Sequence, residues 1–77
     1  MAVTQSIPIG MPVVMTQNVV YALPATQVMV QASAAVDVSS DGTTWSALTG
    51  ANTVGANTAA AFIRCTTTNP TVTLKAQ

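Results

Sequence analysis

The chain has 77 residues, of which 49% are hydrophobic and only 5% are charged, and its formal net charge is zero. This length allows one domain, whose core seldom supplies more than about 3–5 kcal/mol of net stability without disulfides, a metal or partner subunits. Two cations are too few for nucleic-acid binding. With one cysteine and no histidine, the chain cannot form an intrachain disulfide or a zinc site.

Partner subunits are the remaining support, so the composition favours a protein that is stable as part of an assembly. Residues 1–12 are expected to form an extended N-terminal arm ahead of a single β-domain at residues 13–77. Prolines at both ends of the Ile-Gly-Met stretch argue against an interior strand there, because proline lacks the N–H that such a strand donates. The candidate partner-binding residues of the arm are Val3, Ile7, Pro8, Ile9, Met11 and Pro12.

Two arrangements of the arm are open. It docks on another subunit or a scaffold, or it folds back along its own sheet as an edge strand. On the first arrangement, deleting residues 1–12 abolishes partner binding and leaves the β-domain folded.

Short strands are predicted along the rest of the chain. They are expected at residues 13–15, 18–23, 28–32, 36–39, 44–48, 60–65 and 71–76, with a loop of small residues at 49–58. Alternating hydrophobicity at period two predicts half-buried strands. The predicted inward residues of three of them are Val28, Val30, Ala32, Ala61, Ile63, Cys65, Val72, Leu74 and Ala76. Six to seven such strands, with no helical pattern, predict an all-β fold, a small antiparallel β-sandwich or barrel.

A β-hairpin is predicted in the stretch VDVSSDGTTWSAL, because Asp-Gly between alternating apolar residues is typical of a two-residue type I′ turn. This register pairs Val38 with Trp45 and Val36 with Ala47, so the four side chains share the core face. The predicted core and turn residues of the hairpin are Val36, Val38, Asp41, Gly42 and Trp45. Asp37 and Asp41 are expected outside the core.

Two further side chains have alternative roles. Arg64, one of two cations, is expected to pair with Asp37 or Asp41, either within the subunit or as an ion pair across an interface. Cys65 is expected to be a small buried hydrophobe, and the alternative is a reactive or intermolecular thiol.

Catalytic and targeting patterns are not found in the sequence. Without histidine or glutamate, Ser–His and Cys–His nucleophile pairs cannot form, and the two aspartates lie near a turn tip. No Lys or Arg precedes Arg64, and polar residues interrupt every apolar run. We therefore expect no enzyme activity, no cofactor, no metal site, no export signal and no membrane span.

The segment VDVSSDGTTW followed by AAAFIRC resembles a signature of the discoidin-type carbohydrate- and lipid-binding jelly rolls. In that family the tryptophan and arginine strands are framework. The resemblance covers only residues 36–65, and those domains are about twice as long, so it implies a shared hairpin rather than the same complete fold.

A resemblance over most of the chain is carried by IPIGMPVV, NVVYALPA, VDVSSDGTTWSALTG and AAAFIRCTTTNPTVTLK. This pattern is similar to the small Thr/Ala/Val-rich virion proteins of tailed bacteriophages, above all the capsid decoration (cement) proteins. The resemblance implies a compact β-domain, a homo-oligomer that is often a trimer, and a terminal arm laid on the major capsid protein. It also implies assembly into the virion in the host cytoplasm.

Two other functions stay open at this point. A phage tail or head-fibre component has the same composition, and only its position in the particle distinguishes it. A small carbohydrate-binding β-module needs exposed aromatic side chains, and the sequence offers Tyr21, Trp45 and Phe62.

Overall fold

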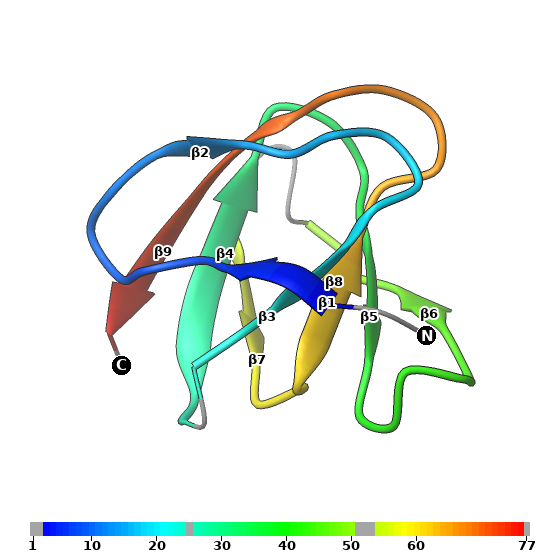
Figure 1. The fold of residues 1–77 in the computed structure, drawn as a ribbon. Helices are drawn as coiled ribbons and strands as arrows, with labels where there is room; N and C mark the ends of the chain where they lie inside the picture. The colour runs from blue at the N-terminus through cyan, green and yellow to red at the C-terminus, as the bar shows by residue number, and fades with distance from the viewer. Residues whose placement is uncertain (1–2, 25, 51–53, 77) are drawn as a thin grey trace.

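The computed structural model describes residues 3–24, 26–50 and 54–76, with side chains from Ser6 onward in those ranges. The described residues form nine strands: β1 (Val3–Ser6), β2 (Val13–Val14), β3 (Val20–Ala22), β4 (Val28–Ala32), β5 (Asp37–Ser39), β6 (Ser46–Ala47), β7 (Ala56–Thr58), β8 (Phe62–Arg64) and β9 (Thr71–Ala76). They make two sheets, a five-stranded one in the order β1-β3-β8-β5-β6 and a four-stranded one in the order β2-β9-β4-β7 (Figure 1). The predicted all-β sandwich is confirmed.

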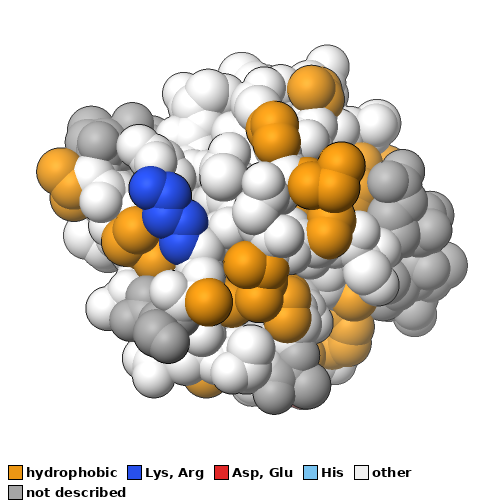
Figure 2. Space-filling view, turned by 90° about the vertical axis from the view of Figure 1, so that its left-hand side faces the viewer, with side chains coloured by type: hydrophobic (Ala, Val, Ile, Leu, Met, Phe, Trp, Pro, Cys, Tyr) orange, Lys and Arg blue, Asp and Glu red, His pale blue; other side chains and the backbone are white. Residues whose placement is uncertain are grey.

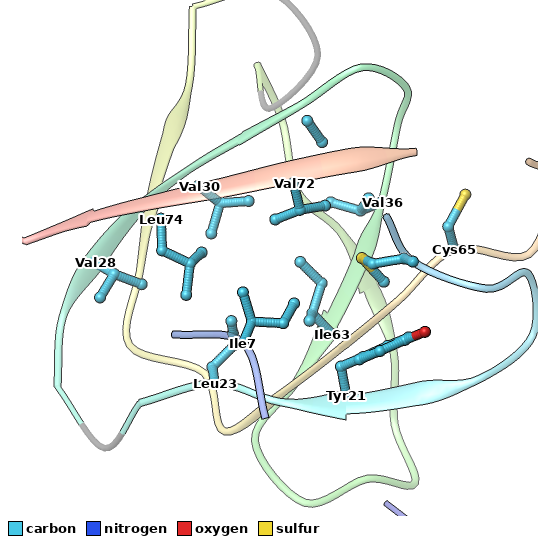
Figure 3. Packing of buried hydrophobic residues seen from close by; sticks show 12 residues of the cluster. Ile7, Tyr21, Leu23, Val28, Val30, Val36, Ile63, Cys65, Val72 and Leu74 are labelled. Atoms are coloured by element: carbon cyan, nitrogen blue, oxygen red, sulfur yellow. The ribbon is translucent and has the colours of Figure 1, made fainter. Parts of the chain in front are cut away.

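The core lies between the two sheets, as Figure 3 shows. Its buried cluster is Ile7, Met15, Tyr21, Leu23, Val28, Val30, Ala32, Val36, Ile63, Cys65, Val72 and Leu74. The period-two pattern correctly identified most of the side chains that β4, β8 and β9 contribute to this cluster. Ala61 is only half-buried and Ala76 is exposed, because each lies at or beyond the end of its strand.

The N-terminal segment takes the second of the two arrangements left open by the sequence. Strand β1 pairs in parallel with β3, and the amide of Ile7 donates to the carbonyl of Ala22 at 3.0 Å. The Ile7 side chain is 1% exposed and points into the core (Figure 3). Ile7 is therefore corrected from a partner-binding residue to a core residue, and the segment is an edge strand of the domain. The side chain of Val3 and residues 1–2 lie outside the described part.

The hairpin register differs by one residue from the prediction. Asp37 pairs with Ala47 and Val38 with Ser46, so the loop is longer than the predicted Asp41–Gly42 turn. Gly42 has a positive φ of 79°, whereas Asp41 does not, and a type I′ turn requires both. This slip moves Trp45 and Ala47 away from the core face, because a one-residue shift exchanges the two faces of a strand.

The residues at 49–58 were predicted to be a loop, and residues 51–53 lie outside the described part. Residues 56–58 instead form β7, which pairs with β4 as the free edge of the four-stranded sheet. Gly55 precedes this strand with a positive φ of 83°, a conformation that favours glycine, and a Cβ there would be in tight contact with the Met29 side chain, at 3.2 Å.

Candidate functional site

An exposed apolar surface lies where the chain passes from the five-stranded sheet to the four-stranded sheet. Ile9, Met11 and Val14 are 42%, 62% and 65% exposed, and we call these three residues the apolar ridge. Pro8 and Pro12, which flank the turn, are exposed as well. Figure 2 views the side on which this turn lies in Figure 1, and hydrophobic side chains stand at several places on it.

Backbone hydrogen bonds hold the ridge in place. Ile9 forms a parallel bridge with Leu74, and the amide of Gly10 donates to the Leu74 carbonyl at 2.9 Å. Val14 lies in β2, which pairs with β9 opposite Thr71. These bonds anchor the chain to β9 on both sides of Met11, which limits the conformational entropy that the backbone would lose on binding.

The three ridge side chains are themselves uncharged, and the exposed cation Lys75 follows Leu74, the residue of β9 that Ile9 bridges. A partner that covers the three apolar side chains would therefore desolvate no ion within the ridge itself. Single exposed hydrophobic residues are normal on soluble proteins, but these three lie within residues 9–14, along the same edge of β9. The ridge is therefore the first candidate site.

A second candidate lies on the outer face of the five-stranded sheet. Directly paired residues of antiparallel strands share a face, and the register places Asp37 opposite Arg64 and Ser39 opposite Phe62. Trp45 lies on this same face, because the Arg64 guanidinium carbon is 4.2 Å from the centroid of its ring. We call Asp37, Trp45, Phe62 and Arg64 the aromatic face.

Within the subunit, Arg64 makes a different contact from the predicted ion pair. Its recorded contact is a cation–π stack on Trp45 rather than a salt bridge to Asp37 or Asp41. Such a stack contributes about 0.5–1 kcal/mol at an exposed site and more when desolvated. Trp45 was predicted to be a core residue and is instead half-buried under Arg64, outside the core.

The loop between β5 and β6 is built by two side chains. The Ser39 hydroxyl accepts the amides of Asp41 and Gly42 at 3.2 and 2.8 Å and donates to the Asp41 carboxylate at 2.9 Å. That carboxylate accepts the amides of Thr43 and Thr44 at 2.8 and 2.9 Å. These bonds replace the predicted tight turn and explain why Ser39 is buried.

Hydrogen bonds from Thr44, Thr43 and Ser39 lower the pKa of the Asp41 carboxyl below its ordinary value of 3.8. A lowered folded-state pKa gives stability that is present above pH 3.8 and is lost as the pH falls through the folded pKa. Asp41→Asn keeps an acceptor oxygen and removes the titration, so we expect its melting temperature to fall less than that of the wild type on acidification. Thermal unfolding by circular dichroism between pH 2 and 6 measures this, and parallel acid losses in both proteins would contradict it.

Cys65 is 1% exposed, as predicted for a small buried hydrophobe. Its thiol donates to the carbonyl of Ala35 at 3.3 Å and lies 3.5 Å from the Thr67 hydroxyl. Burial raises the pKa of the thiol, but hydrogen bonds from Thr67 and Thr68 together outweigh it, so the pKa is lowered on balance. Because solvent does not reach the sulfur, the packing role accounts for this residue in the isolated subunit.

The described residues contain no group of three or more His, Cys, Asp or Glu side chains placed to hold a metal ion. The described part of the chain has no helix that is long and apolar enough to cross a membrane.

Sequence reasoning named some members of these sites and missed others. Ile9 and Met11 were predicted as partner-binding residues, and Asp37 and Arg64 as a candidate interface pair. Val14 was missed, and Phe62 was named only as one of three aromatic side chains for carbohydrate binding. The signal for Phe62 was present, since the alternation in residues 60–65 already placed it on the same face as Arg64.

No protein-family model, curated protein or solved structure matches the chain.

Proposed function

We propose that the chain is a structural virion protein, a capsid decoration protein that binds the outer surface of a bacteriophage shell and stabilises it without enzymatic activity. The single observation that carries this proposal is the apolar ridge, whose three side chains are exposed and which is anchored to β9 on both sides of Met11. The proposed partner is the major capsid protein, and the proposed location is the assembled virion. The resemblance to cement proteins is what points to a capsid rather than another assembly.

Stabilisation of a shell needs only preferential binding. A subunit that binds the assembled shell and not its loose components stabilises the shell by mass action, by about 2.7 kcal/mol per site at a free concentration of about 100 times Kd. Many weakly bound copies therefore add up over a particle. A subunit with few charges suits this role, because its contacts need little ion desolvation.

The carbohydrate-binding alternative is less well supported by the geometry. Sugar-binding modules stack a ligand on exposed aromatic rings, yet Tyr21 is 1% exposed and the ring of Trp45 carries the Arg64 guanidinium. A tail or head-fibre component remains the second candidate, since it would use the same ridge against a different phage subunit.

The ridge is tested by substituting Met11→Gln and Val14→Gln in the full chain. Burial of each apolar side chain is worth about 1.5–3 kcal/mol, so each substitution should weaken binding to capsids that lack the protein by about tenfold or more. Both side chains are exposed in the free protein, so its stability should change by no more than about 0.5 kcal/mol. Co-sedimentation with such capsids measures the binding.

Val54→Gln is the matched control. Val54 is 79% exposed, and it precedes β7 at the opposite edge of the four-stranded sheet from β2. Its substitution removes a similar apolar side chain and should leave binding unchanged. Equal binding by the ridge variants and the wild type would overturn the assignment of the ridge, and binding to tails but not to capsids would favour the second candidate.

A further inference from the structure

The aromatic face brings together charged and aromatic side chains, which are both rare in this chain. It holds two of the four charged side chains and two of the three aromatic side chains of the sequence, although its residues come from only two strands and one loop. Tryptophan and arginine are the residue types most enriched at the energetic centres of protein interfaces. The face lies on the opposite sheet from β2 and β9, where the ridge is held, so the ridge does not account for it.

Hydrogen-bonding groups on this face lack partners. Trp45 Nε1 and Arg64 Nε are buried and have no hydrogen-bond partner among the described residues. Within the described part of the chain, neither Asp37 nor Arg64 takes part in a side-chain hydrogen bond. Both atoms are buried beneath the stacked Trp45 and Arg64 side chains, so the groups that a partner could reach on this face are the Asp37 carboxylate and the outer nitrogens of the Arg64 guanidinium.

The two charges are arranged to suit a second copy of the same chain. Asp37 and Arg64 are direct neighbours across β5 and β8, so the face carries one anion and one cation side by side. In a two-fold interface residue i meets residue j while j meets i, so two opposite charges on one face are complementary to themselves. Lys75, the other cation, lies on β9 of the other sheet and does not disturb this balance.

We propose that the aromatic face is the self-association surface of the protein, in which Arg64 of each copy pairs with Asp37 of the other beside the packed Trp45 and Phe62 side chains. This inference concerns contacts between copies and does not depend on the capsid role of the ridge. It places the ion pair expected for these two residues across an interface between subunits.

Charge exchange tests the proposal. Asp37→Arg and Arg64→Asp each put like charges against each other in a dimer of the variant, and each should raise the dissociation constant by about tenfold or more. Mixing the two variants restores both opposite-charge pairs in a heterodimer. Sedimentation velocity and native mass spectrometry measure the assemblies, and thermal unfolding shows that each variant is folded before mixing. Lys75→Asp is the control, because it reverses an exposed charge on the other sheet.

The expected result is an oligomeric wild type and control, two largely monomeric variants, and a heterodimer on mixing them. A monomeric wild type, single variants that associate like the wild type, or a mixture that stays monomeric would each overturn the proposal. If a variant fails to fold, Asp37→Asn and Arg64→Gln replace the reversals, and unchanged association of both overturns it equally. Met11→Gln should self-associate like the wild type, so failures of the two surfaces are distinguishable.

Discussion

Ile7→Ala is expected to lower the free energy of unfolding by about 2–5 kcal/mol, which is most of the stability that a core of this size supplies. The Ile7 side chain is 1% exposed within the cluster between the sheets, so its removal leaves a cavity lined by core residues (Figure 3). Urea denaturation followed by tryptophan fluorescence measures the change.

The matched control is Ile9→Ala, which truncates the same residue type two positions later. Ile9 is 42% exposed, so its loss should cost far less stability while weakening any contact made through the ridge. A chain lacking residues 1–9 should lose cooperative unfolding altogether, because β1 and Ile7 leave together. A truncated chain as stable as the full one would show that the N-terminal segment is a separate arm after all.

Tyr21→Ala is the second substitution with a large expected effect, about 3–5 kcal/mol of destabilisation by analogy with other buried aromatic truncations. Tyr21 is 1% exposed and pairs with Ile63 of β8 near the middle of the five-stranded sheet. Its hydroxyl accepts the amide of Thr16 at 2.8 Å, which fixes the loop between β2 and β3.

Tyr21→Phe separates the two contributions of this side chain. It keeps the ring in the core and leaves the Thr16 amide without its acceptor, at a cost of about 1–3 kcal/mol if that amide stays shielded from water. Equilibrium unfolding of both variants should therefore rank wild type, Tyr21→Phe and Tyr21→Ala in decreasing order. Equal losses in the two variants would mean that the hydroxyl, and not ring packing, accounts for the role of Tyr21.

The fold class and most of the core could be predicted from the sequence. In β4, β8 and β9 a buried residue alternates with a less buried one, and period two is sufficient to orient such strands. Val36 and Val38 were also placed on the core side, and both contact the cluster. The correct predictions were those that depend only on the residue pattern within a single strand.

The errors at Ile7 and Trp45 have different physical causes. Pro8 and Pro12 argued against an interior strand, yet β1 is an edge strand that ends before Pro8, so neither proline removes a hydrogen bond from it. At the hairpin, Asp-Gly predicted a tight turn, but the side chains of Ser39 and Asp41 bind four loop amides and make a longer loop favourable.

The aromatic face could be predicted only in part, because it depends on strand pairing and on the hairpin register. Asp37 and Arg64 were singled out because charges are rare, but their adjacency depends on the pairing of β5 with β8, which are separated by β6 and β7 in the chain. The stacking of Arg64 on Trp45 follows from the slipped hairpin register. Long-range pairing and a loop stabilised by side chains are not visible in local hydrophobic patterns.

The proposed role of the protein is to bind and stabilise a phage shell. The most direct measurement is the melting temperature of capsids that lack the protein, recorded by calorimetry with and without added wild-type chain. We predict that the added chain co-sediments with the shells and raises their melting temperature, and that Met11→Gln does so less at equal concentration. Shells that melt at the same temperature with and without the wild type, and leave it in the supernatant, would contradict the proposed function.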